Sequence, residues 1–515
     1  MSSQITLPAI LALVPEISLI VLITAVLAYD RLLKPAERRR VGLFTAWGAL
    51  VILLLTVGVW LIFDQPAASA PLGEQLLWGG MIRHDLVTLV FRVMFFIALI
   101  LVSLISLDVE ALQRGEYFAL LMTATLGFSL MAAASDLILL FLALETASIS
   151  LYILAGFLTD SQRSTEAGMK YFVYGAFASA VMLYGFSLIY GTISEILLRV
   201  GASDLLTAPT NIYVIGSALQ QIGQLPVDVE GIFLLAAVMV VAGFGFKISA
   251  VPFHFWTPDV YEGAPAPVTA FVSTASKAAG FAVFIRVFSA GVLGRPNFNN
   301  EWWAMLVAIT IVTMTLGNVL AIFQSNIKRM LAYSSIAQAG YALVGLVALS
   351  ADGSGATLFY LLMYVLTNVA AFGVVVLVSN VAGSDEMRDF YGLSRRAPYL
   401  ALAMLFALLS LGGIPPTAGF FGKFFLFKAA VDVGLWWLAF IGVLNAFISL
   451  YYYLSVLKYM YLYRSDEEAV MIPVSRAARV GLAVAVLGIL YLGVLAGPAF
   501  EWTRQAGAAF FPFPG

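Results

Sequence analysis

Long apolar runs recur along the chain, and their length predicts helices that cross a membrane. About 18 or more predominantly apolar residues in a row suffice for one crossing of a bilayer. Fourteen such spans are expected, near residues 8–29, 41–63, 86–107, 117–134, 136–157, 170–190, 231–251, 266–290, 302–323, 328–349, 356–381, 397–430 (interrupted), 435–462 and 478–498. The runs are continuous rather than alternating, which excludes a transmembrane barrel. We therefore predict an all-α polytopic membrane protein, with a hairpin or a surface helix in its longest connection, 191–230.

Composition narrows the possible chemistry. Hydrophobic residues make up 62% and charged residues only 11% of the 515 residues, whereas soluble domains average about 25% charged residues. The chain has no cysteine and only two histidines, His84 and His254, which excludes cysteine-ligated iron–sulfur clusters and disfavours a bis-histidine haem. No glycine-rich phosphate loop follows a strand, and the basic residues are scattered in short loops. We therefore expect no bound nucleotide or metal and no nucleic-acid partner.

The basic residues indicate how the chain is oriented in the membrane. When loops are assigned alternately to the two sides, one side receives most of them: Arg31, Lys34, Arg38, Arg39, Arg40, Arg114, Arg163, Lys328, Arg329, Arg388, Arg395, Arg396, Arg464 and Arg476. The other side receives Arg83, Arg199, Arg295 and Arg504. Cytoplasmic loops carry the excess of positive charge, so we expect both termini on the non-cytoplasmic side. The first run lacks a basic leader and contains Glu16, and it is expected to be an uncleaved span.

Two spans are interrupted by proline in glycine-rich surroundings, at SAVPFH (249–254) and at LGGIPPTAGFFGK (411–423). They are the seventh and twelfth spans, so an offset of five relates them and the two copies would run in opposite directions. Paired discontinuous helices in inverted repeats point to the conduction site of a transporter. We predict four segments, 1–107, 108–292, 293–465 and 466–515, of which the middle two are inverted five-helix repeats. The alternative is a chance pairing, because glycine and proline are common in membrane helices.

Few ionisable residues are assigned to the predicted spans, and they are the candidates for chemistry: Glu16, Glu145, Lys247, Lys277, Lys423, Lys428 and Lys458, with His254 at the first break. A charged side chain deep in hydrocarbon costs about 3 kcal/mol. Glu145 lies in the middle of a span and is expected to pair with a lysine, since an unpaired carboxylate there would take up a proton. Structural pairing is the plainer explanation, but one buried glutamate does not neutralise three buried lysines.

A row of buried lysines suits proton transfer. Burial lowers the pKa of a lysine side chain and a nearby carboxylate raises it, so a lysine under both influences exchanges a proton when its partner changes. Prolines in the broken spans release backbone carbonyls that can hold water between the lysines. His254 fits either a proton-passing role or that of a satisfied polar group. Lys428 and Lys458 are weaker candidates, and Glu16 is expected to contact a neighbouring protein or lipid headgroups.

Four stretches resemble a known family: EAGMKYFVYGAFASAVMLYG (166–185), FKISAVPFHFWTPDVYEGAPAPVTAFVSTASKAAGF (246–281), NIKRMLAYSSIAQAGYALVG (326–345) and GGIPPTAGFFGKFFLF (412–427). Over nearly its whole length the chain resembles the antiporter-like membrane subunits of respiratory complex I (NDH-1), and Lys277 favours the subunit N group among them. The resemblance implies fourteen helices in two inverted five-helix repeats, with the seventh and twelfth helices broken. It also implies an ion pair between Glu145 and Lys247, with Lys277 at the centre of a relay and Lys423 leading to the exit.

The function implied is that of a proton-translocating membrane subunit of an NADH-quinone oxidoreductase, without a redox centre of its own. NADH or ferredoxin, FMN, iron–sulfur clusters and quinone are then expected in other subunits. The expected partners are membrane subunits of the M, L, K, J, A and H types and the lipid bilayer. The expected location is the bacterial plasma (inner) membrane or an equivalent energy-coupling membrane. Two alternatives are an Mrp-type cation/proton antiporter and a structural subunit that moves no protons.

Overall fold

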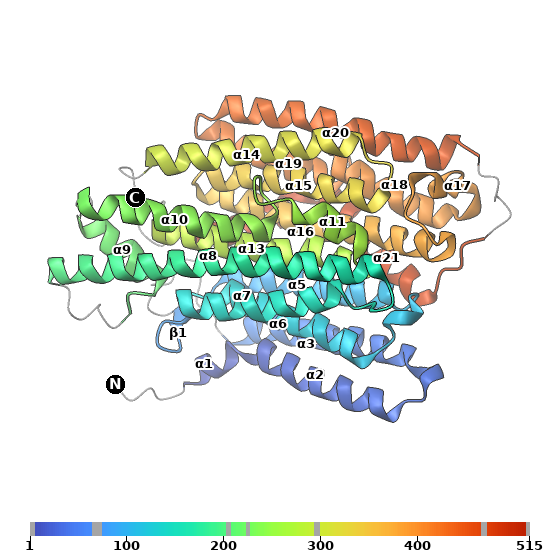
Figure 1. The fold of residues 1–515 in the computed structure, drawn as a ribbon, viewed down its shortest axis with the longest axis horizontal. Helices are drawn as coiled ribbons and strands as arrows, with labels where there is room; N and C mark the ends of the chain where they lie inside the picture. The colour runs from blue at the N-terminus through green and yellow to red at the C-terminus, as the bar shows by residue number, and fades with distance from the viewer. Residues whose placement is uncertain are drawn as a thin grey trace.

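The computed structural model describes residues 6–63, 75–201, 208–222, 227–292, 299–464 and 471–510. Its long helices run roughly along one direction and pack side by side into one bundle, as Figure 1 shows. Within the described ranges, twelve helices are long and apolar enough to cross a membrane. These helices confirm the prediction of an all-α polytopic membrane protein.

The other two predicted spans are also helical but differ from these twelve for physical reasons. The first contains α1 (Leu7–Leu11) and α2 (Val14–Leu32), and α2 carries a glutamate, an aspartate and an arginine. The twelfth is divided into two helices of 15 residues each, α18 (Pro398–Gly412) and α19 (Ala418–Asp432). A helix of that length extends only about 22 Å, which is less than the ~30 Å hydrocarbon core.

The N-terminal segment adds one element that hydropathy did not predict. Strands β1 and β2 form a small antiparallel hairpin, with Leu76 paired to Arg83. In chain order after α2, this segment contains η1 (Pro35–Glu37), α3 (Arg39–Ile62), β1 (Leu76–Leu77), β2 (Ile82–Arg83), α5 (Leu86–Ser106) and η2 (Glu110–Leu112). The hairpin lies directly before α5 and presents Arg83 to the interior, where that side chain is 2% exposed.

The middle of the chain follows the predicted succession of spans. Its first part consists of α6 (Gly115–Ala133), α7 (Leu137–Ala155), α8 (Gln162–Val200), α9 (Ile212–Ile222), α10 (Val227–Ile248), α11 (Trp256–Gly263), α12 (Ala266–Phe271), the π-helix η4 (Val272–Ser276), α13 (Lys277–Arg286) and the π-helix η5 (Val287–Val292). Its second part consists of α14 (Asn299–Ile322), α15 (Ile327–Val347), α16 (Ala351–Ala382), η6 (Met387–Phe390), α17 (Leu393–Arg396), α18, α19 and α20 (Trp436–Leu462). Two helices follow, α21 (Arg476–Val494) and α22 (Ala496–Ala508). Both interrupted spans are broken as predicted, whereas the inverted relation of the two parts stays a prediction.

The predicted connection 191–230 is mostly helical in its described part, apart from a turn at 208–211. Helix α8 continues to Val200, and α9 follows. The prediction of a surface helix is wrong for α9, because Ile212, Tyr213 and Leu219 are buried. Their burial follows from contact with η5, so the connection contributes to the core.

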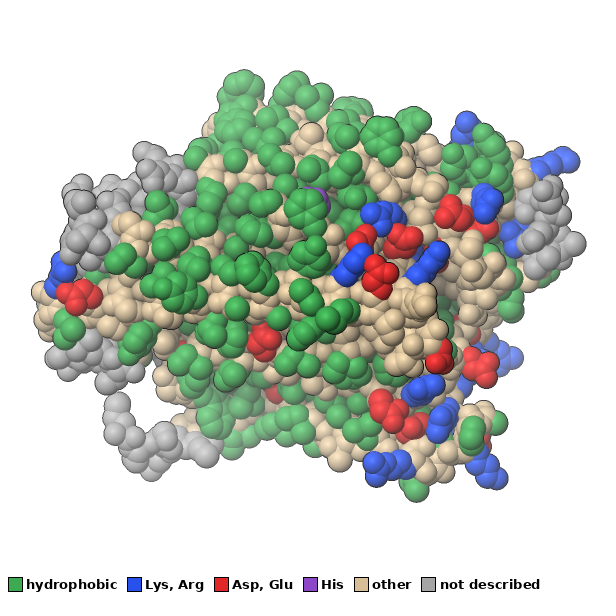
Figure 2. Space-filling model, in the orientation of Figure 1, with side chains coloured by type: hydrophobic (Ala, Val, Ile, Leu, Met, Phe, Trp, Pro, Cys, Tyr) green, Lys and Arg blue, Asp and Glu red, His purple; other side chains and the backbone are tan. Residues whose placement is uncertain are grey.

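The most deeply buried helices come from the middle of the sequence. The apolar core stretches of the spans 266–289 and 351–382 are completely buried, although 351–382 is exposed at its last residues, whereas the outer faces of α3, α8 and α20 remain largely exposed. Figure 2 shows charged side chains gathered toward the right end of the visible face, where the turn between α2 and α3 lies in Figure 1, and mostly hydrophobic side chains elsewhere. An apolar outer surface with charge concentrated at an end is what a bundle in a bilayer requires.

Candidate functional site

Three of the predicted lysines lie inside the bundle, two of them beside the breaks. Lys247 is in the last turn of α10, Lys277 begins α13, and Lys423 is in α19. Their exposed fractions are 3%, 2% and 5%, so none of them reaches the surface. A buried ammonium needs hydrogen-bond acceptors or an opposite charge, because removing it from water is costly. The acceptors therefore show what the site can do.

Lys247 reaches across to α7. Its Nζ donates a hydrogen bond of 3.1 Å to Ser148 Oγ. Its stem packs over Gly280 of α13, where a Cβ atom would lie 3.2 Å from Lys247 Cγ. Gly280 is one turn beyond Lys277, so this close approach brings α10 against the turn that begins with Lys277. A cavity of about 10 Å³ beside Lys247 and Ser148 has room for about one water molecule.

The predicted ion pair between Glu145 and Lys247 is not formed in this structure. Glu145 is half-buried on α7, and its Oε1 atom has no hydrogen-bond partner among the described residues. Ser148 lies one helical turn further on, and it satisfies the Lys247 ammonium instead. Positions three apart on a helix are about 5–6 Å apart, so the two acceptors are neighbours on one face. Glu145 still lies within electrostatic range of Lys247.

Lys277 is held by one residue of α15. Its Nζ donates to the carbonyl oxygen of Ser335 over 2.7 Å and to Ser335 Oγ over 2.9 Å. The five residues before Lys277 form the π-helix η4, in which Ser273 accepts a hydrogen bond from Asn368 of α16. π-helical turns are rare and occur frequently at functional sites. Lys277 is thus bound by neutral oxygens, which leaves its charge uncompensated by direct contact.

His254 lies in the turn between α10 and α11, close in sequence to the first break. The side chain is buried, and its Nδ1 atom has no hydrogen-bond partner in the described part of the chain. Its ring packs on that of Phe255, with 4.4 Å between centroids. No hydrogen bond joins His254 to Lys247 or Lys277, whose bonds go to serines. A role for His254 in proton transfer therefore stays a prediction.

Lys423 lies at the second break and uses the carbonyls that the break releases. Its Nζ donates to the carbonyl oxygens of Leu411 and Gly412 over 2.8 and 3.3 Å. These are among the last carbonyls of α18, which have no acceptor role within their own helix. The ammonium also lies 4.6 Å from the centre of the Tyr341 ring, within the range of a cation–π interaction. The break therefore supplies backbone acceptors to a buried cation.

A group of polar side chains connects the surroundings of Lys277 with Lys423, and the sequence reasoning did not single it out. Gln338, one turn beyond Ser335 on α15, donates to the Leu411 carbonyl over 3.1 Å and to Tyr453 of α20 over 3.0 Å. Tyr453 in turn is hydrogen-bonded to Ser334. Ser334, Ser335 and Gln338 belong to the stretch SSIAQAG (334–340), which places polar residues in the middle of an apolar span. That interruption was the available signal.

Two arginines inside predicted spans were also overlooked, and both form buried ion pairs. Arg92 of α5 donates to Glu16 over 2.7 Å, so the prediction that Glu16 contacts a neighbouring protein or lipid headgroups is wrong. Arg286 of α13 pairs with Asp85 over 3.1 Å, and Arg83 pairs with the same carboxylate over 3.0 Å. A single arginine scarcely alters the hydropathy of a long apolar run, and its partner is invisible without the fold.

Among the described residues, Asp85 is the only carboxylate that forms an ion pair with Arg83 and Arg286. Burial raises the pKa of its carboxyl, but the neighbouring guanidiniums of Arg286 and Arg83 outweigh burial and hold it below its usual range. Tyr213 of α9 accepts hydrogen bonds from both arginines. The cluster joins the hairpin, α9 and α13, and it stabilises the packing of these elements rather than extending the row of lysines.

The fold and the row of buried lysines define an antiporter-like membrane protein. A family model described as NADH:quinone oxidoreductase/Mrp antiporter, TM, matches residues 134–449, and this range contains Glu145, Lys247, Lys277 and Lys423. The NADH-quinone oxidoreductase subunit N of Moorella thermoacetica is 40% identical over 488 residues, which cover 94% of this chain and 95% of that relative. The chain therefore belongs to the NADH-quinone oxidoreductase subunit N family, within the larger family of complex I and Mrp membrane subunits.

Solved structures agree with this assignment. A chain of respiratory complex I from Thermus thermophilus superimposes with a TM-score of 0.75 at 31% identity, covering 95% of this chain and 98% of that one. A chain of the Mrp complex from Dietzia sp. DQ12-45-1b superimposes with a TM-score of 0.81 at 20% identity, covering 98% of both chains. At that identity the Mrp likeness shows a common fold alone, so the relationship to complex I carries the assignment.

Proposed function

We propose that this chain translocates protons as a membrane subunit of NADH-quinone oxidoreductase, through Lys247, Lys277 and Lys423. One observation carries the proposal: Gln338 and Lys423 donate to the same Leu411 carbonyl, while Ser335, one turn before Gln338, holds Lys277. Hydroxyl groups can accept one proton and donate another, so Ser335, Ser334 and Tyr453 provide carriers between the two lysines. Gln338 and the carbonyl hold the ends of this path in place.

The path between Lys247 and Lys277 depends on water. Buried polar atoms nearly always have a hydrogen bond to protein or to ordered water. Three such atoms near the first break, Ser249 Oγ, His254 Nδ1 and Thr257 Oγ1, have no partner in the described residues. We expect water to bond them and to link the Lys247 ammonium to Lys277 across the contact at Gly280. Lysine suits this role because it exchanges one proton and remains compact.

Glu145 is the expected point of control. A carboxylate near an ammonium favours its charged form, so moving or neutralising Glu145 favours release of the Lys247 proton to neighbouring water. Lys247 is then a neutral amine. Its proton passes to Lys277 once Lys277 has given its own proton onward toward Lys423 and is itself a neutral amine. Glu145 is half-buried on the face of α7, where a neighbouring subunit can act on it. The neighbours are expected among subunits of the M, L, K, J, A and H types.

Electron transfer belongs to other subunits in this proposal. NADH or ferredoxin, FMN, iron–sulfur clusters and quinone are expected there, and this chain is expected to hold none of them. The end of the bundle that is rich in basic residues is expected to face the cytoplasm, with both termini on the opposite side.

The proposal is tested by proton pumping per electron in proteoliposomes that contain the purified whole complex. Lys277→Met and Lys247→Met are expected to preserve assembly and to lower pumping per electron strongly, because each removes a proton carrier. The matched control is Lys458→Met, at an exposed lysine of α20, which is expected to leave pumping unchanged. Undiminished pumping per electron in an assembled Lys277→Met complex would identify the chain as a structural subunit.

The antiporter alternative has a separate test. The purified chain alone is reconstituted, and sodium-dependent proton exchange is measured with and without a sodium gradient. The proposed function predicts no such exchange. Exchange that is lost in Lys277→Met would instead favour a cation/proton antiporter.

A further inference from the structure

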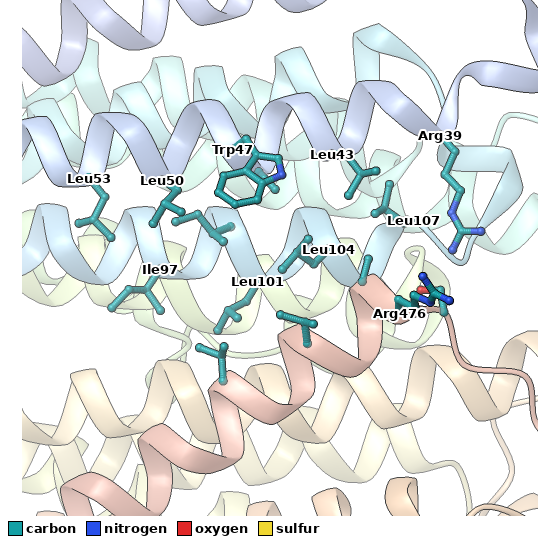
Figure 3. A pocket seen from close by; sticks show the side chains of 16 residues that line it. Arg39, Leu43, Trp47, Leu50, Leu53, Ile97, Leu101, Leu104, Leu107 and Arg476 are labelled. Carbon is teal, nitrogen blue, oxygen red and sulfur yellow. The ribbon is translucent and has the colours of Figure 1, made fainter.

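An apolar groove opens on the outside of the bundle, away from the three lysines. Helices α3, α5 and α21 form its walls, and its volume is about 750 Å³. Figure 3 shows Trp47, Leu50 and Leu53 of α3 on one side and Ile97 and Leu101 of α5 beside them. Trp47 is 65% exposed, so the groove is open along α3 toward the surroundings. An open cavity of this size lies within the range of pockets that bind small molecules.

The two ends of the groove differ in charge. Arg39 of α3 and Arg476 of α21 lie at one end, whereas Leu53 and Ile97 lie at the other, as Figure 3 shows. Arg39 donates with one nitrogen to Asp108 over 2.7 Å and is 51% exposed in its side chain. Arg476 is exposed and has no ion-pair partner within the described ranges. Two guanidiniums against one carboxylate leave this end with a positive charge and with donors to spare.

The length of the groove distinguishes the ligands that could fill it. Fourteen residues of α3 separate Arg39 from Leu53, which corresponds to about 21 Å along the helix axis. The hydrocarbon core of a bilayer is about 30 Å thick, so each leaflet contributes about half of that. The groove therefore matches one headgroup and the acyl region of one leaflet, and it is too short for a helix that crosses the whole membrane.

We propose that this groove binds an anionic phospholipid from the leaflet at its arginine end. The phosphate lies against Arg39 and Arg476, and the acyl chains follow Trp47, Leu50 and Leu101 toward the middle of the membrane. Arginine suits the phosphate because its planar guanidinium donates two parallel hydrogen bonds to phosphate oxygens. The charge sets the headgroup preference and the groove sets the orientation, so a zwitterionic lipid binds there less well.

The experiment uses the purified whole complex in proteoliposomes that contain a trace of photoactivatable phospholipid, with the reactive group on an acyl chain. Labelled peptides from α3 and α21 are compared with labelled peptides from the exposed face of α20, which reports contact with bulk lipid. Basic residues near a membrane surface contribute about 1 kcal/mol each toward anionic lipid. We therefore expect phosphatidylglycerol to label the groove at least about tenfold more than phosphatidylcholine, relative to α20.

Matched variants separate a built site from general surface charge. Arg39→Gln with Arg476→Gln is expected to abolish the preference for phosphatidylglycerol. Arg40→Gln with Arg479→Gln changes the same charge on the same two helices outside the groove, and it is expected to keep the preference. Val480→Trp fills the groove but keeps both arginines, and it is expected to lower labelling by both lipids. Each variant is compared at equal assembly and quinone-reductase activity.

Equal labelling of the groove by the two lipids in the wild-type complex would overturn the proposal. A preference that survives in the Arg39→Gln and Arg476→Gln variant would do the same, as would a map of the complex with a helix of another subunit in the groove.

Discussion

Gln338 and Lys423 donate hydrogen bonds to one and the same carbonyl oxygen, that of Leu411, over 3.1 and 2.8 Å. The two side chains come from different helices, α15 and α19, and the shared oxygen belongs to a third, α18. A carbonyl has two lone pairs and can accept both bonds. The break in the twelfth span therefore joins a buried cation to the polar residues that lead back to Lys277.

This relationship predicts that Gln338→Leu uncouples the two halves of the relay. The substitution keeps a similar volume but removes the donor to Leu411 and the contact to Tyr453. A buried hydrogen bond that loses one partner costs about 1–3 kcal/mol. We expect this cost to add to the barrier for proton transfer between the two lysines, which slows transfer through this chain about tenfold and lowers pumping per electron. Pumping is measured in proteoliposomes alongside quinone reduction. Gln324→Leu, at a less buried glutamine just after α14 whose side chain donates to Leu320 of that helix, should have no effect on pumping.

Gly419→Ala is expected to disturb the second break. A Cβ atom at Gly419 would lie 1.7 Å from the carbonyl oxygen of Ser410, so α19 must move away from α18. Overpacking of this kind typically costs about 1–3 kcal/mol or more. The shift of α19 would also lengthen the hydrogen bond from Lys423 to the Leu411 carbonyl. We expect less assembled complex and a lower thermal midpoint. Gly191→Ala is the control, because no described residue lies within 4 Å of a Cβ at that position of α8.

Asp85→Asn is expected to destabilise the complex more than Arg286→Met does. The first change leaves Arg83 and Arg286 buried without their carboxylate, whereas the second leaves Asp85 paired with Arg83. Breaking a buried ion pair costs about 3–5 kcal/mol. The thermal midpoint of the purified complex measures the difference. Asp432→Asn, which breaks an exposed pair with Lys428, should change the midpoint little; the opposite ranking of the two buried variants would contradict the assigned pairing.

His84 predicts a pH dependence of stability. It lies between β2 and α5, where burial and the nearby Arg92 lower the pKa of its imidazole from 6.5 to about 4. Below pH 6.5 the unfolded chain binds a proton that the folded chain does not, so stability falls as the pH drops from about 6.5 to about 4. Above pH 6.5 the imidazole is neutral in both the folded and the unfolded chain, so this loss of stability is absent there. The full shift corresponds to on the order of 3 kcal/mol.

The variant His84→Phe tests this sign. Its thermal midpoint should fall less than that of the wild-type complex between pH 6.5 and 4.5, because phenylalanine has no proton to bind. The His84 ring packs against Trp60, with 5.3 Å between centroids, and phenylalanine keeps an aromatic ring at this place. Parallel curves for the two proteins over this range would show that His84 does not titrate as described.

The sequence by itself determined the spans, the two breaks and three of the lysines that the structure buries. These features are local: an apolar run of sufficient length must be a helix in hydrocarbon, and proline within it must interrupt the hydrogen-bond ladder. The family assignment rested on the same stretches, of which 246–281 carries two of the lysines. None of this required knowledge of which helices touch.

Only the tertiary structure decided which partner each charged group has. Lys247 meets Ser148 rather than Glu145, and Glu16 meets Arg92 within the chain. Arg286 meets Asp85 across 201 residues of sequence. Hydropathy places a residue at a depth in the membrane, but its partner depends on the rotation of each helix about its axis and on which helices are neighbours. Those quantities follow from packing of the whole bundle, because contacts at places such as Gly280 and Gly419 decide how closely two helices approach.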